Sequence, residues 1–212
     1  LIHSFIKKAK SIIIFLFCFS NIYSKNIIPY TTIPHLDTAI SYYNKGVKEK
    51  TNNNDGKEVE MFLRYVGLPK GNPWCAAFIS YCEGVCTGIL NKTKSALARK
   101  FVTKKSISAK DVLYGRVVIK PGTLVIFQKG NTLNGHIGTV YYWDKERGQL
   151  VEGNAGDKVS FMERSIQPRN YSRIIAFTII EYDESIQYKI DKYKQKKFDK
   201  TENGTVNENR TF

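Results

Sequence analysis

The sequence predicts an α+β fold in which N-terminal helices pack on a small antiparallel β-sheet. Before Asp111, apolar residues recur every three or four positions, a spacing typical of amphipathic helices. Beyond Asp111, short apolar runs alternate with turn residues, a pattern typical of strands. Helices in the first half and strands in the second favour an α+β arrangement, and short connections between the strands favour antiparallel pairing.

The individual elements follow from the same patterns. Helical spacing predicts helices at residues 36–48 and 57–66, in the segment that begins near residue 72, and at residues 95–101. Strands are predicted at residues 122–127, 136–143, 149–152 and 174–180. Their turn signals include Pro121-Gly122 and Asn134-Gly135.

The third helix carries the most informative residue of the chain. Asn72 is its expected N-cap and Pro73 its expected first residue, since proline needs no N–H donor there. Cys75 then falls in the first turn, where unpaired N–H groups and the positive end of the helix dipole stabilise a thiolate. Cys75 is therefore a candidate nucleophile; the alternative is a small buried packing residue.

A nucleophilic cysteine needs a base, and His136 is the candidate. Of the three histidines, His3 lies in a predicted export signal and His35 in a linker, which leaves His136 in the strand region. Its neighbours Gly135 and Gly138 leave room around a strand end. The alternative interpretation is an ordinary surface histidine in a strand.

Two polar residues on the next strand are candidates for orienting the imidazole. Glu152 and Asn154 are two positions apart, so they share a face if the strand continues through both. Glu152 is expected to accept from the imidazole N–H, and Asn154 to orient the ring or polarise a carbonyl. The alternative is a strand that ends in the loop beginning at Gly153.

A chain of 212 residues fits one compact domain with end segments. We expect a signal peptide at 1–24, a linker and helix at 25–56, one main domain at 57–182, and a basic flexible tail at 183–212. The signal has lysines at positions 7, 8 and 10 before the apolar run 12–19, which is too short to span a membrane. The protein is therefore expected to be secreted or periplasmic, and lipid attachment at Cys18 is disfavoured by the bulky Phe17.

The net charge of +14 favours an anionic partner. Nucleic acid is disfavoured, because the sequence has no metal-finger spacing, basic zipper or aromatic-interleaved sheet signature. Membrane contact is expected only through the signal segment. The remaining candidate is an acidic polymer such as those of a cell wall.

The cysteines that follow the signal are odd in number, so at least one free thiol is expected. Cys82 and Cys86 are four apart on a helix, where their Cβ directions suit a disulfide poorly, and both are expected to be packing residues. A zinc site made from these cysteines and His136 is disfavoured by the spacing. No cofactor or metal is expected.

Four motifs together resemble the CHAP family of the NlpC/P60-like, papain-like cysteine peptidases and amidases. They are residues 72–78 (Asn-Pro-Trp-Cys-Ala-Ala-Phe), 122–127 (Gly-Thr-Leu-Val-Ile-Phe), 135–140 (Gly-His-Ile-Gly-Thr-Val) and 151–154 (Val-Glu-Gly-Asn). The resemblance covers roughly residues 57–180 and implies a papain-like fold. It assigns Cys75 as nucleophile, His136 as general base and then acid, Glu152 as the residue orienting His136, and Asn154 as a further polar member.

The resemblance also implies an activity. It predicts a monomeric hydrolase that cleaves peptidoglycan amides, as an N-acetylmuramoyl-L-alanine amidase or a peptide endopeptidase. Unlike the better-known phage lysins of the family, the chain has no recognisable wall-binding module after the main domain. The alternatives are a non-catalytic wall-binding protein on the same fold and a cysteine amidase acting on an amide outside the wall.

Overall fold

The computed structural model describes residues 27–86, 88–132, 134–167, 172–188 and 191. The expected signal peptide and most of the expected basic tail lie outside these residues. In order, the elements are α1 (Pro34–Lys45), α2 (Lys57–Tyr65), α3 (Cys75–Gly84), the 3-10 helix η1 (Ala98–Phe101), α4 (Ala109–Leu113), β1 (Leu124–Lys129), β2 (Gly135–Trp143), β3 (Arg147–Glu152), β4 (Ser160–Ser165) and β5 (Ser172–Thr178). Helices precede a five-stranded antiparallel sheet, which confirms the predicted α+β class.

The strands lie in the order β4-β3-β2-β1-β5, and each neighbouring pair is antiparallel. The central strands β1, β2 and β3 follow one another in sequence, as short hairpin connections require. The sequence patterns missed two elements, α4 and the edge strand β4. A capping signal does precede α4, since the Ser108 side chain accepts from the Asp111 N–H at 3.1 Å.

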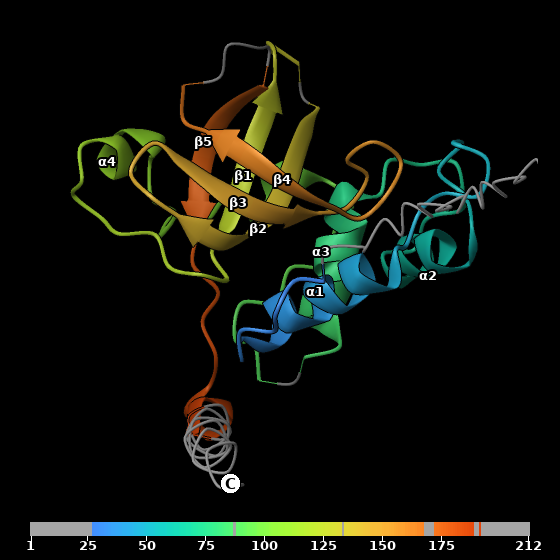
Figure 1. Cartoon of the computed structure of the whole chain (residues 1–212), viewed down its shortest axis with the longest axis horizontal. Helices are drawn as coiled ribbons and strands as arrows, with labels where there is room; N and C mark the ends of the chain where they lie inside the picture. The colour runs from blue at the N-terminus through green and yellow to red at the C-terminus, as the bar shows by residue number, and fades with distance from the viewer. Residues whose placement is uncertain (1–26, 87, 133, 168–171, 189–190, 192–212) are drawn as a thin grey trace, which may run out of the picture.

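Figure 1 shows α1, α2 and α3 gathered on one side of the sheet, with α4 on the other. The larger core lies between α1–α3 and the sheet, and α1 contributes to it together with the later helices. Alternate strand residues face this core, as the two-residue repeat of a strand requires: Leu124, Ile126, Ile137 and Val151. The helices and the sheet therefore share one apolar layer.

A second cluster fills the opposite face of the sheet. Its members come from the strands, from α4 and from the connection between α4 and β1: Val112, Ile119, Val125, Phe127, Val140, Trp143, Leu150, Ile174 and Phe177. Trp143 and Phe177 meet edge to face with their ring centroids 4.9 Å apart. The sheet is thus buried on both faces along its centre.

The close approach of α3 to the end of β3 depends on a missing side chain. A Cβ at Gly153 would lie 2.7 Å from the Cβ of Phe78 in the middle of α3. No ordinary side chain fits there, so glycine allows the helix to settle against the strand end. This contact helps to set where α3 begins relative to the sheet.

Cys75, Cys82 and Cys86 are buried free thiols. Helix α3 ends at Gly84, so Cys86 lies beyond the helix that was expected to carry both cysteines. Its thiol donates to the Cys82 carbonyl at 3.1 Å, and the two sulfurs form no disulfide. The prediction that Cys82 and Cys86 are packing residues is therefore confirmed. Among the described helices, none has the length and apolar character needed to cross a membrane.

Candidate active site

Cys75 is the first residue of α3. The prediction that it lies in the first turn is confirmed, but the predicted capping is wrong. Trp74 occupies the N-cap position, and the Asn72 side chain instead donates to the Pro69 carbonyl at 3.0 Å. Asn72 thus closes its own loop, and the helix begins later than the Asn-Pro signal indicated.

This start leaves the first backbone donors of α3 available. The first intrahelical bond runs from the Phe78 N–H to the Trp74 carbonyl at 2.8 Å. The N–H groups of Cys75, Ala76 and Ala77 precede it and have no carbonyl one turn earlier in the helix. The Cys75 sulfur therefore lies at the positive end of the helix dipole.

Trp74 fixes the backbone immediately before the cysteine. Its side chain is fully buried, and its indole Nε1–H donates to Glu49 Oε1 at 2.8 Å. It also stacks against Phe62 of α2, with ring centroids 5.9 Å apart. A buried carboxylate and an aromatic neighbour thus hold the helix start in one place.

His136 lies near the start of β2 and faces Glu152, the last residue of β3. Its Nε2 is 2.8 Å from Glu152 Oε2. Glu152 pairs directly with Gly138 across the strands, so its side chain must cross Gly138 to reach the imidazole two residues away. A Cβ at Gly138 would lie only 2.6 Å from Glu152 Cγ, which explains why glycine is needed there.

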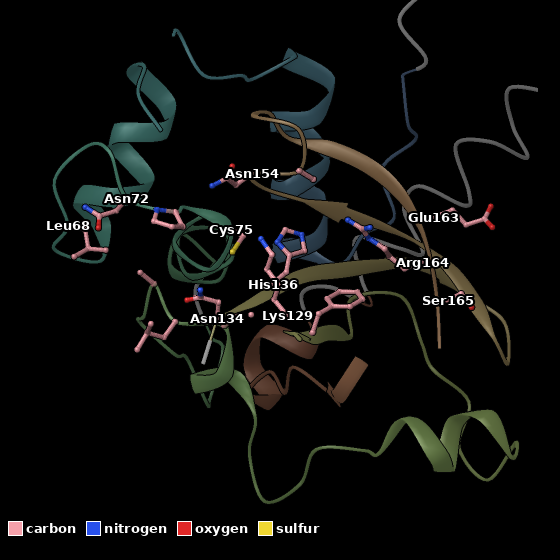
Figure 2. Close-up of a pocket in the computed structure, with 17 residues that line it drawn as sticks. Leu68, Asn72, Cys75, Lys129, Asn134, His136, Asn154, Glu163, Arg164 and Ser165 are labelled. Carbon is pink, nitrogen blue, oxygen red and sulfur yellow. The ribbon is translucent and has the colours of Figure 1, made fainter. Parts of the chain in front are cut away.

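The Cys75 sulfur points toward the His136 ring, as Figure 2 shows. Burial alone would lower the pKa of His136, but the hydrogen bonds and charges of Cys75 and Glu152 outweigh it and raise that pKa to about 9. Because Nε2 is engaged by Glu152, Nδ1 is the ring nitrogen left for the sulfur. The arrangement favours the imidazolium form of His136.

Glu152 has a second cationic partner that the sequence patterns did not reveal. Arg164 on β4 donates from Nε to Oε1 at 2.7 Å and from Nη2 to Oε2 at 2.5 Å, a bidentate pair. The Glu152 side chain is completely buried, and burial would raise its pKa. The bonds from Arg164 and His136 prevail and hold the pKa of Glu152 below its usual value.

Arg164 was missed because β4 was missed. The segment 160–165 reads Ser-Phe-Met-Glu-Arg-Ser and has no polar/apolar alternation, so it carries no clear strand signal. In the structure Ser160 pairs with Glu152 of β3, Met162 with Leu150 and Arg164 with Gly148, so these side chains share one face of the sheet. The role of Arg164 therefore depends on a strand pairing that the sequence did not reveal.

Asn154 lies beyond the end of β3, in a left-handed backbone conformation with φ +55°. The strand therefore ends before Asn154, which confirms the alternative that the sequence left open, and the two residues do not share a strand face. The Asn154 side chain donates to Asn54 Oδ1 at 3.0 Å, in the loop before α2. It still borders the same cleft, so the structure brings Cys75, His136 and Glu152 into one cluster with Asn154 beside it.

The cluster opens into a cleft of about 870 Å³. The His136 side chain is 23% exposed while Glu152 is fully shielded, so the imidazole reaches the cleft and its carboxylate partner does not. The wall combines apolar and polar side chains, including Leu68, Leu97, Phe127, Lys129, Asn134 and Glu163. Such a mixed lining suits a substrate with both apolar and polar groups.

Within the described part of the chain, no three His, Cys, Asp or Glu side chains are placed to hold a metal ion. Comparisons with protein-family models, with curated proteins and with solved structures found no match for this chain.

Proposed function

We propose that this protein is a cysteine hydrolase of the CHAP type, with a papain-like fold, that cleaves amide bonds in peptidoglycan. The observation that carries the proposal is the relay from Cys75 at a helix N-terminus to His136 and on to buried Glu152. A nucleophile, a base and a group that orients the base are what acyl transfer requires. A packing cysteine has no need of such neighbours.

In the proposed reaction, the Cys75 thiolate attacks the amide carbonyl carbon. The His136 imidazolium gives its proton to the amide nitrogen as the C–N bond breaks, and the amine leaves. The neutral imidazole then takes a proton from water, whose oxygen attacks the thioester and releases the carboxylic acid. Cys75 returns as thiolate and His136 as imidazolium, so the cycle closes without any cofactor.

Backbone N–H groups at the start of α3 supply the oxyanion site in this proposal. One of these donors is the backbone N–H of Cys75 itself, which precedes the first hydrogen bond within the helix. Donors of this kind stabilise the charge that develops on the carbonyl oxygen, and each is typically worth about 3 kcal/mol of transition-state energy.

The substrate follows from the cleft and from the sequence. The cleft, of about 870 Å³, has room for a short peptide, and the sequence predicts export to the compartment in which cell walls are built. The four motifs that resemble the CHAP family point to the substrate that the resemblance implies, which is peptidoglycan. Peptidoglycan offers amide bonds both between sugar and stem peptide and within the peptide.

The test is to incubate the purified protein with sacculi and identify the released fragments by mass spectrometry. The proposal expects new free amines, with each cleavage assigned to one type of amide bond. Sacculi that stay intact, or products with new reducing sugar ends, would contradict it. Cleavage of small non-wall amides alone would instead support an amidase acting outside the wall.

A further inference from the structure

The positive charge of the folded chain is concentrated in one segment. Residues 92–120, between α3 and β1, contain nine lysines and arginines and a single acidic residue, Asp111. Residues 27–91 contain six basic and six acidic residues, and residues 121–188 contain seven basic and eight acidic ones. The rest of the fold is therefore close to neutral, and an even solubilising charge does not explain the distribution.

This basic segment is fixed to the sheet along the outer edge of β5. Ile107 forms a β-bridge with Phe177, and the Phe101 carbonyl accepts from the Thr178 hydroxyl at 2.8 Å. Ser106 and Thr178 hydroxyls lie 2.7 Å apart. The segment thus forms a continuous strip rather than a loose loop, and Figure 1 shows it in green, passing to α4.

The strip begins at the mouth of the cleft. Ala96, Leu97 and Ala98 line the cleft that contains Cys75, and η1 follows directly. A polymer lying along the basic segment would therefore run past the entrance to the candidate active site. The charge is placed where it can hold a long substrate close to the nucleophile.

The basic groups of the strip are available. All nine are exposed, and within the described part of the chain only Lys105 and Arg116 form ion pairs, with Glu181 and Asp111. Exposed cations of this kind attract anions over roughly a Debye length, about 8–10 Å at moderate salt. Most of them are lysines, which bind phosphate as point charges.

The chemistry of the strip disfavours nucleic acid and membrane. Single-stranded nucleic acid stacks its bases on a series of exposed aromatic faces, but in this segment Phe101 is buried and only Tyr114 is exposed. The charged groups of Lys110 and Arg116 lie 6.0 and 5.5 Å from the centre of that one ring. Binding to a lipid surface uses an amphipathic helix, whereas α4 has only five residues. A flexible polyanion needs neither feature.

We propose that the basic segment 92–120 is a docking surface for an anionic polymer of phosphodiester-linked units attached to the wall that the cleft cleaves. The attachment to the wall rests on the proposed function, whereas the binding itself does not. The surface would raise the local concentration of the wall at Cys75 without recognising the order of the polymer's units.

The experiment measures binding without turnover, in the full chain carrying Cys75→Ala. A fluorescent poly(glycerol phosphate) chain is titrated with this protein, and binding is followed by anisotropy at about 50 and about 300 mM salt. The test variant adds Lys100→Gln, Lys104→Gln and Lys110→Gln. The matched control adds Lys48→Gln, Lys57→Gln and Lys145→Gln, which remove the same charge from exposed lysines elsewhere.

The proposal expects the test variant to bind at least about tenfold more weakly, with a shallower salt dependence, while the control changes binding less than about twofold. Equal losses in both variants would overturn it, because net charge alone would then explain binding. Equal or tighter binding of polyglutamate, duplex DNA or anionic vesicles would also overturn it.

A second measurement separates this proposal from the proposed function. Both lysine variants, with Cys75 intact, are given short soluble wall fragments that carry no anionic polymer. Equal cleavage by both variants, together with slower lysis of intact polymer-bearing walls by the test variant alone, supports docking. Lysis of those walls at equal rates by both variants would overturn it. An absence of cleavage by the wild-type protein would overturn the proposed function, and the binding result would still decide the docking of the polymer.

Discussion

At the scale of single residues, Glu152 links two cations within the sheet. It is fully buried, it binds His136 through one oxygen, and it binds Arg164 through both. A buried carboxylate with a single partner is costly, and removing one partner of such a pair typically costs about 3–5 kcal/mol. Arg164 therefore positions Glu152, and through it the imidazole, while its own side chain also lines the cleft.

We predict that Arg164→Gln lowers kcat/KM about 100-fold and moves the acid limb of the pH profile to higher pH. The reason is that the pKa of Glu152 rises once the guanidinium is lost, so the carboxylate becomes protonated at a higher pH. The measurement is a pH profile of hydrolysis. Arg164→Lys should restore part of the rate.

The matched control is Arg173→Gln on the edge strand β5, where the arginine binds Gln128 at 3.1 Å, away from Glu152. It should leave the pH profile unchanged. An unshifted acid limb in Arg164→Gln would show that Arg164 has only a structural role.

The pH dependence of the wild-type protein follows from His136. Its pKa is raised to about 9, so the imidazolium persists to that pH and is lost above it. We predict that kcat/KM stays high through neutral pH and falls in an alkaline limb centred near pH 9. A limb near pH 6.5, the ordinary value for histidine, would contradict the contacts seen around His136.

At the scale of elements, β2 and β3 bring the base and its partner together only because a side chain is absent between them. We predict that Gly138→Ala lowers activity at least about tenfold, since its Cβ would displace Glu152 Cγ, which is 2.6 Å away. Hydrolysis and urea unfolding are measured together. A loss of activity that merely follows a loss of folded protein would contradict this account.

Helix α3 also carries a buried acid far from the cleft. Glu83 is fully buried, and burial raises its pKa to about 8, which the Thr93 backbone N–H and the Lys92 charge offset only in part. The native state therefore keeps the proton between about pH 4.5 and 8 while the unfolded chain releases it. The stability that the native state gains from keeping this proton is fully present below about pH 4.5 and is lost as the pH rises through 8.

We predict that Glu83→Gln removes the loss of stability that the wild-type protein shows as the pH rises. Relative to wild type, the variant should gain about 2 to 4 kcal/mol of unfolding free energy between pH 5 and pH 8. Urea unfolding at both pH values measures it, with the exposed Glu146→Gln as a control that should show no such gain. Equal pH dependence in wild type and Glu83→Gln would contradict the buried neutral acid.

The sequence predicted the long helices, η1 and four of the strands because each has a clear apolar repeat or turn signal. It missed α4 and β4, because these elements are short and have few apolar residues from which a repeat could be recognised. It also misplaced the start of α3, because the burial of Trp74 against Glu49 fixes that start, and such a contact between distant residues leaves no local pattern. Local signals thus described the elements better than their ends.

The candidate site was predictable to the same extent. Cys75, His136 and Glu152 could be named from residue type, spacing and family resemblance, and the structure brings them together. Arg164 could not, because its role depends on the pairing of β4 with β3. Asn154 was placed on a strand that in fact ends at Glu152, since the left-handed turn after it has no certain sequence signal.

At the scale of the whole molecule, the fold separates two tasks. The junction of α3 with β2 and β3 holds the candidate catalytic groups. The basic segment 92–120 connects α3 to β1 in the sequence and pairs with β5 through Ile107. Both border one cleft. The proposed reaction depends on the attack of Cys75 on an amide carbonyl.

The most direct test is the release of new amino groups from purified sacculi by wild type, Cys75→Ala and Cys82→Ala. Cys82 is a matched control, because it is a buried thiol on the same helix with no contact to His136 in the described structure. The account predicts release by wild type and Cys82→Ala, and none by a folded Cys75→Ala protein. Release by Cys75→Ala at the wild-type rate would contradict it.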